Sequence, residues 1–359
     1  MSLGLRLYVD FVVFLFGAAA GSFFNVCIHR MPREESIVNP PSHCPKCNQP
    51  IRWHDNIPLV SFFVLRGKCR HCGGTISPRY LFIELLTASL FLAVWLKYEF
   101  LWVAPIYWVL IGGLIVSTFI DFERFIIPNE ITYGGIVTGL MMSAVYPPLL
   151  GASTVLSGLG RSVVGLLAGS LPLYGMVEIG KLVFGRRKVS LTPGTLVRIA
   201  DGKLVCEGEE IPWGDMFNRD SDRIRFQAAT LKFKDQSLEN VAVRVSATHL
   251  EVGEQRHELA QIGLVEATTD LLVIPREAMG LGDVKFIAAI GAFLGWEASL
   301  FTIFSSSVIG GAVGLLLVAI GKKELHAKIP YGPYIALAAL LWIFFGREVV
   351  DWYFGFLQG

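Results

Sequence analysis

Long apolar runs constrain the fold of this chain more than any other feature of its sequence. A helix needs about 20 apolar residues to cross a hydrocarbon core of about 30 Å. Hydrophobic residues make up 53% of the 359 residues and charged residues 17%, which is typical of membrane proteins rather than soluble domains. The runs lie near 8–28, 81–98, 101–120, 132–150, 162–184, 297–320 and 331–347, with a shorter one near 284–296. We therefore predict a polytopic α-helical membrane protein with about eight transmembrane helices.

The first apolar run shares one feature with secretory signal peptides, an Ala-Ala-Ala-Gly stretch at 18–21. However, the run contains Asp10, is preceded by a single basic residue, Arg6, and continues through Phe23 and Phe24. A signal peptide begins with more positive charge and ends at its cleavage site. We therefore predict that residues 1–28 form a retained transmembrane helix.

The distribution of basic residues predicts the topology. Segment 29–80 holds eight lysines and arginines, so the positive-inside rule makes it cytoplasmic and places the N-terminus outside. Counting helices onward assigns 121–131, 185–282 and 321–330 to the cytoplasm, and each contains basic residues. An even number of helices then places the C-terminus outside. The net charge of +1 gives no indication of a nucleic-acid partner, and we predict none.

A polar stretch from about 189 to 274 interrupts the apolar pattern. Apolar and polar residues alternate at 195–199, 223–226 and 241–245, and this period of two is typical of half-buried strands. The alternative is a disordered loop, which usually has a lower apolar fraction. The predicted order is a first helix at 1–28, a cytoplasmic four-cysteine zinc module at 29–80, helices 2–5 at 81–185, a cytoplasmic β-rich insertion at 186–275, and the last three helices at 276–359.

Four cysteines predict a metal site. Cys44 and Cys47 form one C-x-x-C pair, Cys69 and Cys72 form another, and 21 residues separate the pairs. This spacing is close to that of a zinc ribbon, in which four thiolates complete the tetrahedral shell of a structural Zn²⁺. Iron is an alternative occupant of four thiolates. Two disulfides are disfavoured in a reduced cytoplasmic segment.

Other residues near the two cysteine pairs bear on the same site. His43 and His71 could each replace a thiolate, although four cysteines make this unnecessary. The remaining cysteines, Cys27 and Cys206, are interpreted as ordinary buried thiols.

Two aspartates are predicted to meet at the cytoplasmic face. Asp121 ends the third apolar run, and Asp283 begins the sixth within Met-Gly-Leu-Gly-Asp-Val-Lys-Phe. Two carboxylates at hydrogen-bonding distance share one proton, so that one activates water while the other polarises a carbonyl, as in aspartic proteases. Gly280 and Gly282 are expected to allow a tight turn and to leave room for a substrate strand.

Structural roles for these acids compete with catalysis. Asp283 could be the N-cap of its helix, and Asp121 could be a solvated acid at a helix end. Glu84, Glu123 and Glu178 are further acids near the predicted cytoplasmic face. The chemistry of the residues alone does not choose between these acids.

A series of ordered motifs carries a family resemblance. The sequence resembles the type IV prepilin peptidases, which are Gly-x-Gly-Asp membrane aspartic proteases, over the whole chain except about 189–274. The motifs are Gly-Ser-Phe-Phe-Asn-Val at 21–26, His-Arg-Met-Pro at 29–32, the two C-x-x-C pairs, Asn-Ile-Pro-Leu-Val-Ser at 56–61, Ile-Ser-x-Arg-Tyr at 76–80, Glu-Leu-Leu-Thr at 84–87, Ile-Asp at 120–121, Ile-Pro-Asn at 127–129, Gly-x-Gly-Asp-x-Lys at 280–285, Gly-Ala-Phe-Leu-Gly-Trp at 291–296 and Ile-Pro-Tyr-Gly-Pro-Tyr at 329–334.

The resemblance implies a bifunctional enzyme of the bacterial inner membrane. Such enzymes remove the basic leader from type IV prepilins or type II secretion pseudopilins at the cytoplasmic face, and many then methylate the new N-terminus with S-adenosylmethionine. The catalytic aspartates of the family fall on Asp121 and Asp283, and Gly280, Gly282 and Lys285 complete the second motif. The family's four cysteines match the C-x-x-C pairs, and a glycine tied to methyl transfer matches Gly67. Prepilins, membrane lipid and the pilus or secretion assembly machinery are the implied partners.

Three alternatives remain open at this stage. The protein could be a peptidase without methyl-transfer activity, since no G-x-G-x-x-G nucleotide-binding motif is evident. It could be another Gly-x-Gly-Asp intramembrane protease, although the cysteine pairs and the segment at 329–333 argue against this. A membrane scaffold or transporter would explain the helices but would not need paired acids at one face. The insertion could dock substrate, contact the assembly machinery or brace the zinc module.

Overall fold

The computed structural model describes two compact units. The first comprises Met1–Tyr174 with Gly280–Gly359, and the second comprises Gly175–Met279. The described residues are 2–99, 102–184, 186–200, 202–206, 209–213, 216–217, 222–234, 236–253, 255–275, 280–321 and 329–358. The basic residues Lys322, Lys323 and Lys328 of the predicted last cytoplasmic loop lie outside these ranges, as does the start of the predicted last segment at 276–279.

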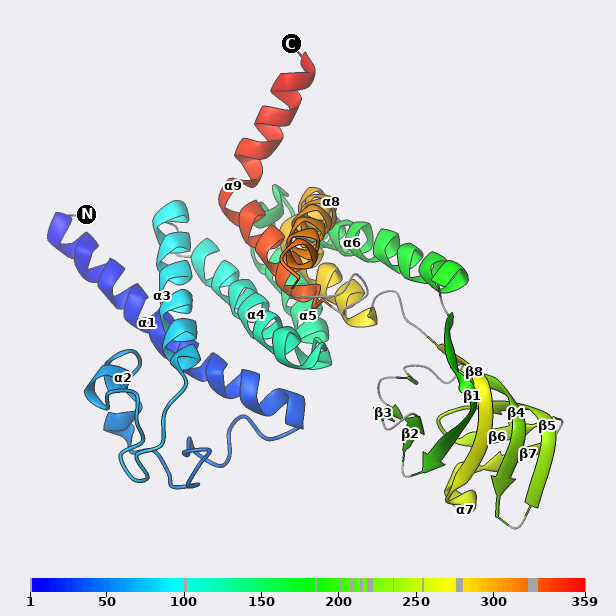
Figure 1. Ribbon diagram of the computed structural model, residues 1–359. Helices are drawn as coiled ribbons and strands as arrows, with labels where there is room; N and C mark the ends of the chain where they lie inside the picture. Colours follow the sequence, from blue (N-terminus) through cyan, green and yellow to red (C-terminus); the bar gives the residue numbers. More distant parts are fainter. Residues whose placement is uncertain are drawn as a thin grey trace. The chain divides into compact units, whose positions relative to one another are not determined.

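Within the described residues, each apolar run of the sequence lies mainly in a helix (Figure 1). Short 3-10 turns are found at Met31–Arg33, Trp53–Asp55 and Pro147–Leu150. The helices are α1 Leu3–Arg30, α2 Val60–Val64, α3 Pro78–Tyr98, α4 Val103–Arg124, α5 Asn129–Val145, α6 Val155–Phe184, α7 Leu259–Ile262, α8 Leu281–Ala319 and α9 Gly332–Gln358.

Among the described residues, five helices are long and apolar enough to cross a membrane: α1, α3, α4, α6 and α8. The 17-residue α5 and the apolar part of α9, Gly332–Gly346, are shorter. The prediction of a polytopic helical protein is therefore confirmed in outline. The number of about eight spans stays a prediction.

The two apolar runs at 284–296 and 297–320 form one helix, α8, instead of two separate helices. The helix bends at Gly295, whose φ of 85° and ψ of −178° lie outside the helical region. Only glycine adopts such a φ without a steric penalty. The first half of α8 is a buried central helix, with every residue from Phe286 to Phe293 shielded from solvent. Gly295 thus separates this buried half, which begins with Asp283, from the more exposed second half.

Small residues bring the helices of the first unit into close contact. A methyl group added at Gly17 or Gly21 of α1 would lie 2.7 Å from the backbone of α3. At Gly165 of α6 it would clash with the carbonyl oxygen of Gly291 in α8 and would lie 2.7 Å from Cα of Gly295. Helices that lack a large hydrophobic driving force for association pack through such small residues. The hydroxyl of Ser299 also donates to the carbonyl of Gly165 at 2.9 Å.

The second unit contains an eight-stranded antiparallel sheet, which confirms the predicted β-rich insertion. The strand order is β3-β2-β1-β8-β4-β5-β6-β7. The strands are β1 Arg186–Ala200, β2 Lys203–Cys206, β3 Glu209–Pro212, β4 Ile224–Phe233, β5 Gln236–Val245, β6 His249–Val252, β7 Gln255–Glu258 and β8 Val265–Pro275. Arg186 is paired with Pro275, so the chain enters and leaves the sheet at neighbouring positions.

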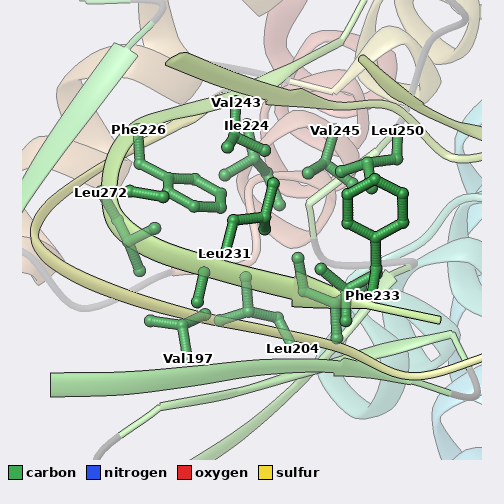
Figure 2. Close-up of a cluster of buried hydrophobic side chains, with 14 of the residues drawn as sticks. Val197, Leu204, Ile224, Phe226, Leu231, Phe233, Val243, Val245, Leu250 and Leu272 are labelled. Carbon is green, nitrogen blue, oxygen red and sulfur yellow. The ribbon is translucent and has the colours of Figure 1, made fainter. Parts of the chain in front are cut away.

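The alternating residues of the insertion form its core. Figure 2 shows side chains from β1, β2, β4, β5, β6 and β8 pointing toward one another, among them Val197, Phe226, Leu231 and Leu250. Burial alternates along β4 from Ile224 to Ala228, as the period of two in the sequence predicts. Cys206 belongs to this core, in agreement with its interpretation as a buried thiol.

We expect Gly165→Ala to destabilise the helical unit, because overpacking a close helix contact typically costs about 1–3 kcal/mol. Gly160→Ala is the matched control on the same helix, since no atom lies within 4 Å of its added methyl group. Thermal unfolding of the purified protein in detergent should show a lower Tm for Gly165→Ala only. Equal Tm values for the two variants would contradict the close α6–α8 packing.

Candidate active site and four-cysteine centre

Asp121 is a buried carboxylate at the end of a helix. It lies in the last turn of α4, and only 5% of its surface is exposed. The helix ends at Phe125, whose φ of 57° is left-handed and whose N–H donates to the carbonyl of Asp121. One carboxylate oxygen, Oδ2, accepts the N–H of Gly332 at the start of α9 at 2.8 Å. The alternative of a solvated acid is therefore wrong for Asp121.

Asp283 lies in the first turn of α8. The two carboxylates are close enough to interact electrostatically. Ile127, in the turn after α4, lies next to the starts of both α8 and α9, because methyl groups added at Gly282 and Gly332 would lie 3.4 Å and 3.3 Å from its side chain. The start of α8, the turn after α4 and the start of α9 therefore converge at one place.

Lys285 connects the second motif to α5. Its Nζ donates to Oδ1 of Asn129, the first residue of α5, at 2.6 Å. The same ammonium lies 5.0 Å from the centroid of the Tyr133 ring, a distance typical of a cation–π contact. Lys285 thus holds the first turn of α8 against α5. This positioning role was not evident from the sequence motif.

Gly280, not Asp283, is the N-cap of α8. Asp283 is the third residue of the helix, and its carboxylate accepts the N–H of Gly280, as the acid of a capping box does. Neither Gly280 nor Gly282 has a positive φ, so the expected tight turn that requires glycine is absent. A methyl group at Gly282 would meet Ile127 at 3.4 Å, an ordinary van der Waals contact, so the packing against Ile127 does not require glycine either.

The competing acids have other partners. Glu123 forms an ion pair with Arg79 of α3, and Glu84 accepts the N–H of Leu59 at 2.7 Å. Glu178 belongs to the second unit. Asp121 and Asp283 influence each other electrostatically, and their assignment as the catalytic pair stays a prediction. The role of Gly332 was missed by reasoning from residue types, although its Tyr-Gly-Pro-Tyr context was part of the resemblance.

The four thiols of Cys44, Cys47, Cys69 and Cys72 gather in one cluster. Their Sγ atoms all lie within 4.8 Å of one another, and Sγ of Cys44 lies 3.9 Å from Sγ of Cys72. Four sulfurs at 2.3 Å from a tetrahedral Zn²⁺ lie about 3.8 Å apart, so the cluster fits one metal ion. All six cysteines are free thiols, which agrees with the expectation that no disulfide forms.

Two equivalent turns build this cluster. The N–H of Cys44 donates to the carbonyl of Gln49 and that of Cys69 to the carbonyl of Gly74, at 2.9 Å and 2.8 Å. The residue after each second cysteine, Asn48 or Gly73, is left-handed, with φ of 54° and 66°. His43 and His71 do not belong to the cluster. The backbone N–H groups of Cys72 and His71 lower the pKa of the Cys69 thiol to about 7, and the thiolate is the form that binds a metal.

Gly67 lies in the turn before the second cysteine pair. Its φ of 66° is left-handed, and an added methyl group would lie 3.3 Å from the ring of Phe62. A side chain at this position would therefore strain the turn and displace Phe62.

We expect the purified protein to contain about one equivalent of zinc per chain, because four thiolates complete the shell of a single ion. Cys44→Ser and Cys69→Ser should lose most of this metal, whereas Cys27→Ala, which removes a buried thiol outside the cluster, should retain it. Inductively coupled plasma mass spectrometry measures the content and separates zinc from iron. Full metal content in both serine variants would exclude a four-thiolate site.

Two protein-family models match separate parts of the chain. Residues 15–98 match the bacterial peptidase A24 N-terminal domain, and residues 251–315 match the type IV leader peptidase family. No solved structure matches the chain.

Several relatives carry the name prepilin leader peptidase/N-methyltransferase. The Aeromonas hydrophila protein is 27% identical over 366 residues, covering 95% of this chain and 92% of the relative. The Pseudomonas aeruginosa protein is 24% identical over 365 residues with the same coverage. The Klebsiella pneumoniae protein is 38% identical over 188 residues, covering 48% of this chain and 75% of the relative. With both matched domains and these relatives, the chain belongs to the type IV leader peptidase family, peptidase A24.

Proposed function

We propose that this protein is a membrane aspartic endopeptidase with a second, methyl-transfer activity. It removes the basic leader from type IV prepilins or type II secretion pseudopilins and then methylates the new N-terminus with S-adenosylmethionine. Membership of the leader peptidase family and relatives similar along 95% of the chain support both activities. The convergence of the end of α4, the first turn of α8 and the start of α9, with the electrostatic interaction between Asp121 and Asp283, carries the assignment of the peptidase site.

The two carboxylates can perform peptide hydrolysis as a pair. The ionised carboxylate takes a proton from water while the water oxygen attacks the scissile carbonyl carbon, and the protonated carboxyl donates to the carbonyl oxygen. Collapse of this intermediate breaks the C–N bond, and the leaving amine takes up a proton. Because coupled acids titrate together, the two roles belong to the pair and not to one residue. The N–H of Gly332 holds Asp121 in position.

The site suits a substrate that has a basic leader followed by an apolar helix. We infer that segment 29–80 and both aspartates face the cytoplasm of a bacterium, with both chain termini on the outer side of the inner membrane. The scissile bond of such a substrate would then lie at the interface where the basic leader leaves the membrane. Exposed acids such as Glu130 could attract the leader.

The four-cysteine centre is proposed to hold Zn²⁺ as a structural ion. A closed shell of four thiolates leaves no open coordination position for catalysis. The ion would therefore fix the two turns of the module, without contacting the reacting peptide bond. For the sheet of the second unit, we propose a role in docking the substrate or the assembly machinery.

We expect Asp121→Asn and Asp283→Asn each to reduce leader cleavage by at least about 100-fold, because each removes one member of the acid–base pair. Cleavage of a purified prepilin, followed by mass spectrometry of its N-terminus, measures the effect. Glu123→Gln is the matched control at the same helix end and should cleave at nearly the rate of the unmodified protein. Normal cleavage by either aspartate variant would refute the assignment.

Gly332→Ala tests the positioning of Asp121. The added methyl group would lie 2.8 Å from Oδ2 of Asp121 and would displace the carboxylate, and a displacement of about 1 Å can cost about 100-fold in rate. Gly311→Ala is the control, since nothing lies within 4 Å of its added methyl group. Equal cleavage rates for the two variants would show that the contact with Gly332 does not position Asp121.

A further inference from the structure

An apolar groove of about 630 Å³ is lined mainly by residues of α1, α4, α5 and α8. Along α4 the lining extends from Pro105 to Val116, which corresponds to about 16 Å at a rise of 1.5 Å per residue. Three of its apolar side chains, Phe16, Phe23 and Val109, are 54%, 48% and 49% exposed. The groove is therefore open on the outside of the helical unit.

One end of this groove adjoins the two aspartates. Phe286, which lines the groove, lies one turn beyond Asp283 on α8. The lining continues along the buried half of α8 as far as Phe293. Glu130 lines the groove from the first turn of α5, which Lys285 holds against α8. The groove therefore runs from the candidate active site toward the middle of the helices.

The charge of the lining is confined to the end next to the aspartates. Among the described residues that line the groove, Glu130 is the one charged side chain, and it is exposed. The polar groups of Trp108 and Thr138 already donate to backbone carbonyls, at 2.9 Å and 2.8 Å. The groove thus offers one negative charge at the active-site end and an apolar surface beyond it.

Two glycines leave part of the groove wall uncovered by side chains. A methyl group added at Gly134 of α5 would meet no atom within 4 Å, and one at Gly113 of α4 would meet only Ile131, at 3.6 Å. Both glycines line the groove, and neither has a positive φ. The helices themselves therefore do not require glycine here. Small residues of this kind allow another helix to approach closely within a membrane.

The geometry points to this groove as the seat of the substrate's apolar helix over the turns that follow the scissile bond. With the scissile peptide at the aspartates, the chain beyond it enters the groove at Phe286 and lies against α4 and α5. The basic leader leaves on the opposite side, past the carboxylate of Glu130. This inference rests on the peptidase part of the proposed function and adds a subsite that reads the apolar part of the substrate.

The size of the groove suits one face of such a helix. A helix about 10 Å wide and about 16 Å long occupies about 1,300 Å³, roughly twice the volume of the groove. One face of the substrate helix therefore packs into the groove, as in other helix-in-groove complexes, and the other face stays toward lipid. A phospholipid chain is the competing occupant, but the negative charge of Glu130 repels the phosphate of its head group and attracts basic residues.

Gly134→Trp tests the groove in full-length protein reconstituted in lipid nanodiscs. The indole fills open space, so we expect KM for a complete prepilin to rise by about 10-fold or more with little change in kcat, as for the loss of apolar binding. A short peptide with the leader but without the apolar helix should be affected much less. Val137→Trp is the control, because Val137 lies one turn further on α5, is exposed and does not line the groove. An unchanged KM for prepilin, or equal losses with both substrates, would overturn the groove assignment.

Photo-cross-linking provides a second measurement that covers misfolding of Gly134→Trp. A benzoylphenylalanine at Val109, which is half-exposed and lines the groove, is introduced into Asp121→Asn protein so that bound prepilin stays uncut. Mass spectrometry should map its cross-links to the first three turns of the prepilin helix, whereas the same group at Val137 should react mainly with lipid. Cross-links from position 109 to phospholipid alone would overturn the inference and leave the peptidase assignment standing. Unmodified protein that fails to cleave prepilin would instead overturn the proposed function.

Discussion

The hydrogen bond between the N–H of Gly332 and the buried carboxylate of Asp121 joins the end of α4 to the start of α9. A carboxylate with 5% exposure needs a donor, and this one comes from the first residue of a helix more than 200 residues later in the chain. The contact requires glycine, because any side chain would meet Oδ2 or Ile127. Once α9 is docked there, Ile127 and Gly282 bring the first turn of α8 to the same place.

Close helix packing makes that arrangement possible. The first half of α8 is buried from Phe286 to Phe293, and glycines of α5 and α6 allow those helices to approach its backbone. The bend at Gly295 then lets the second half leave the bundle core and pack against α9, where Tyr331 hydrogen bonds with Ser306 and Ser307. The buried half of α8 thus supports Asp283, and the half after Gly295 contributes to a surface that is compatible with lipid.

The module of two cysteine turns does not depend on close helix packing for its stability. Its segment between α1 and α3 has little regular structure, with one five-residue helix and isolated β-bridges, and few large apolar residues there are buried. A metal ion held by four thiolates can supply the stability that such a small core lacks. The module also lines a cavity of about 840 Å³ together with the ends of α1 and α3.

The sequence by itself determined the helical class, the β-rich insertion and the grouping of the four cysteines, because apolar period and ligand spacing are local properties of the chain. The catalytic pairing of Asp121 and Asp283 stays a prediction from motif order. It did not determine that Gly280 is the N-cap of α8, that two apolar runs form one bent helix, or that Lys285 holds Asn129. Only the tertiary structure decided these points. They depend on which backbone groups of distant segments lie within about 3 Å of one another, and hydrogen bonds act only at that range.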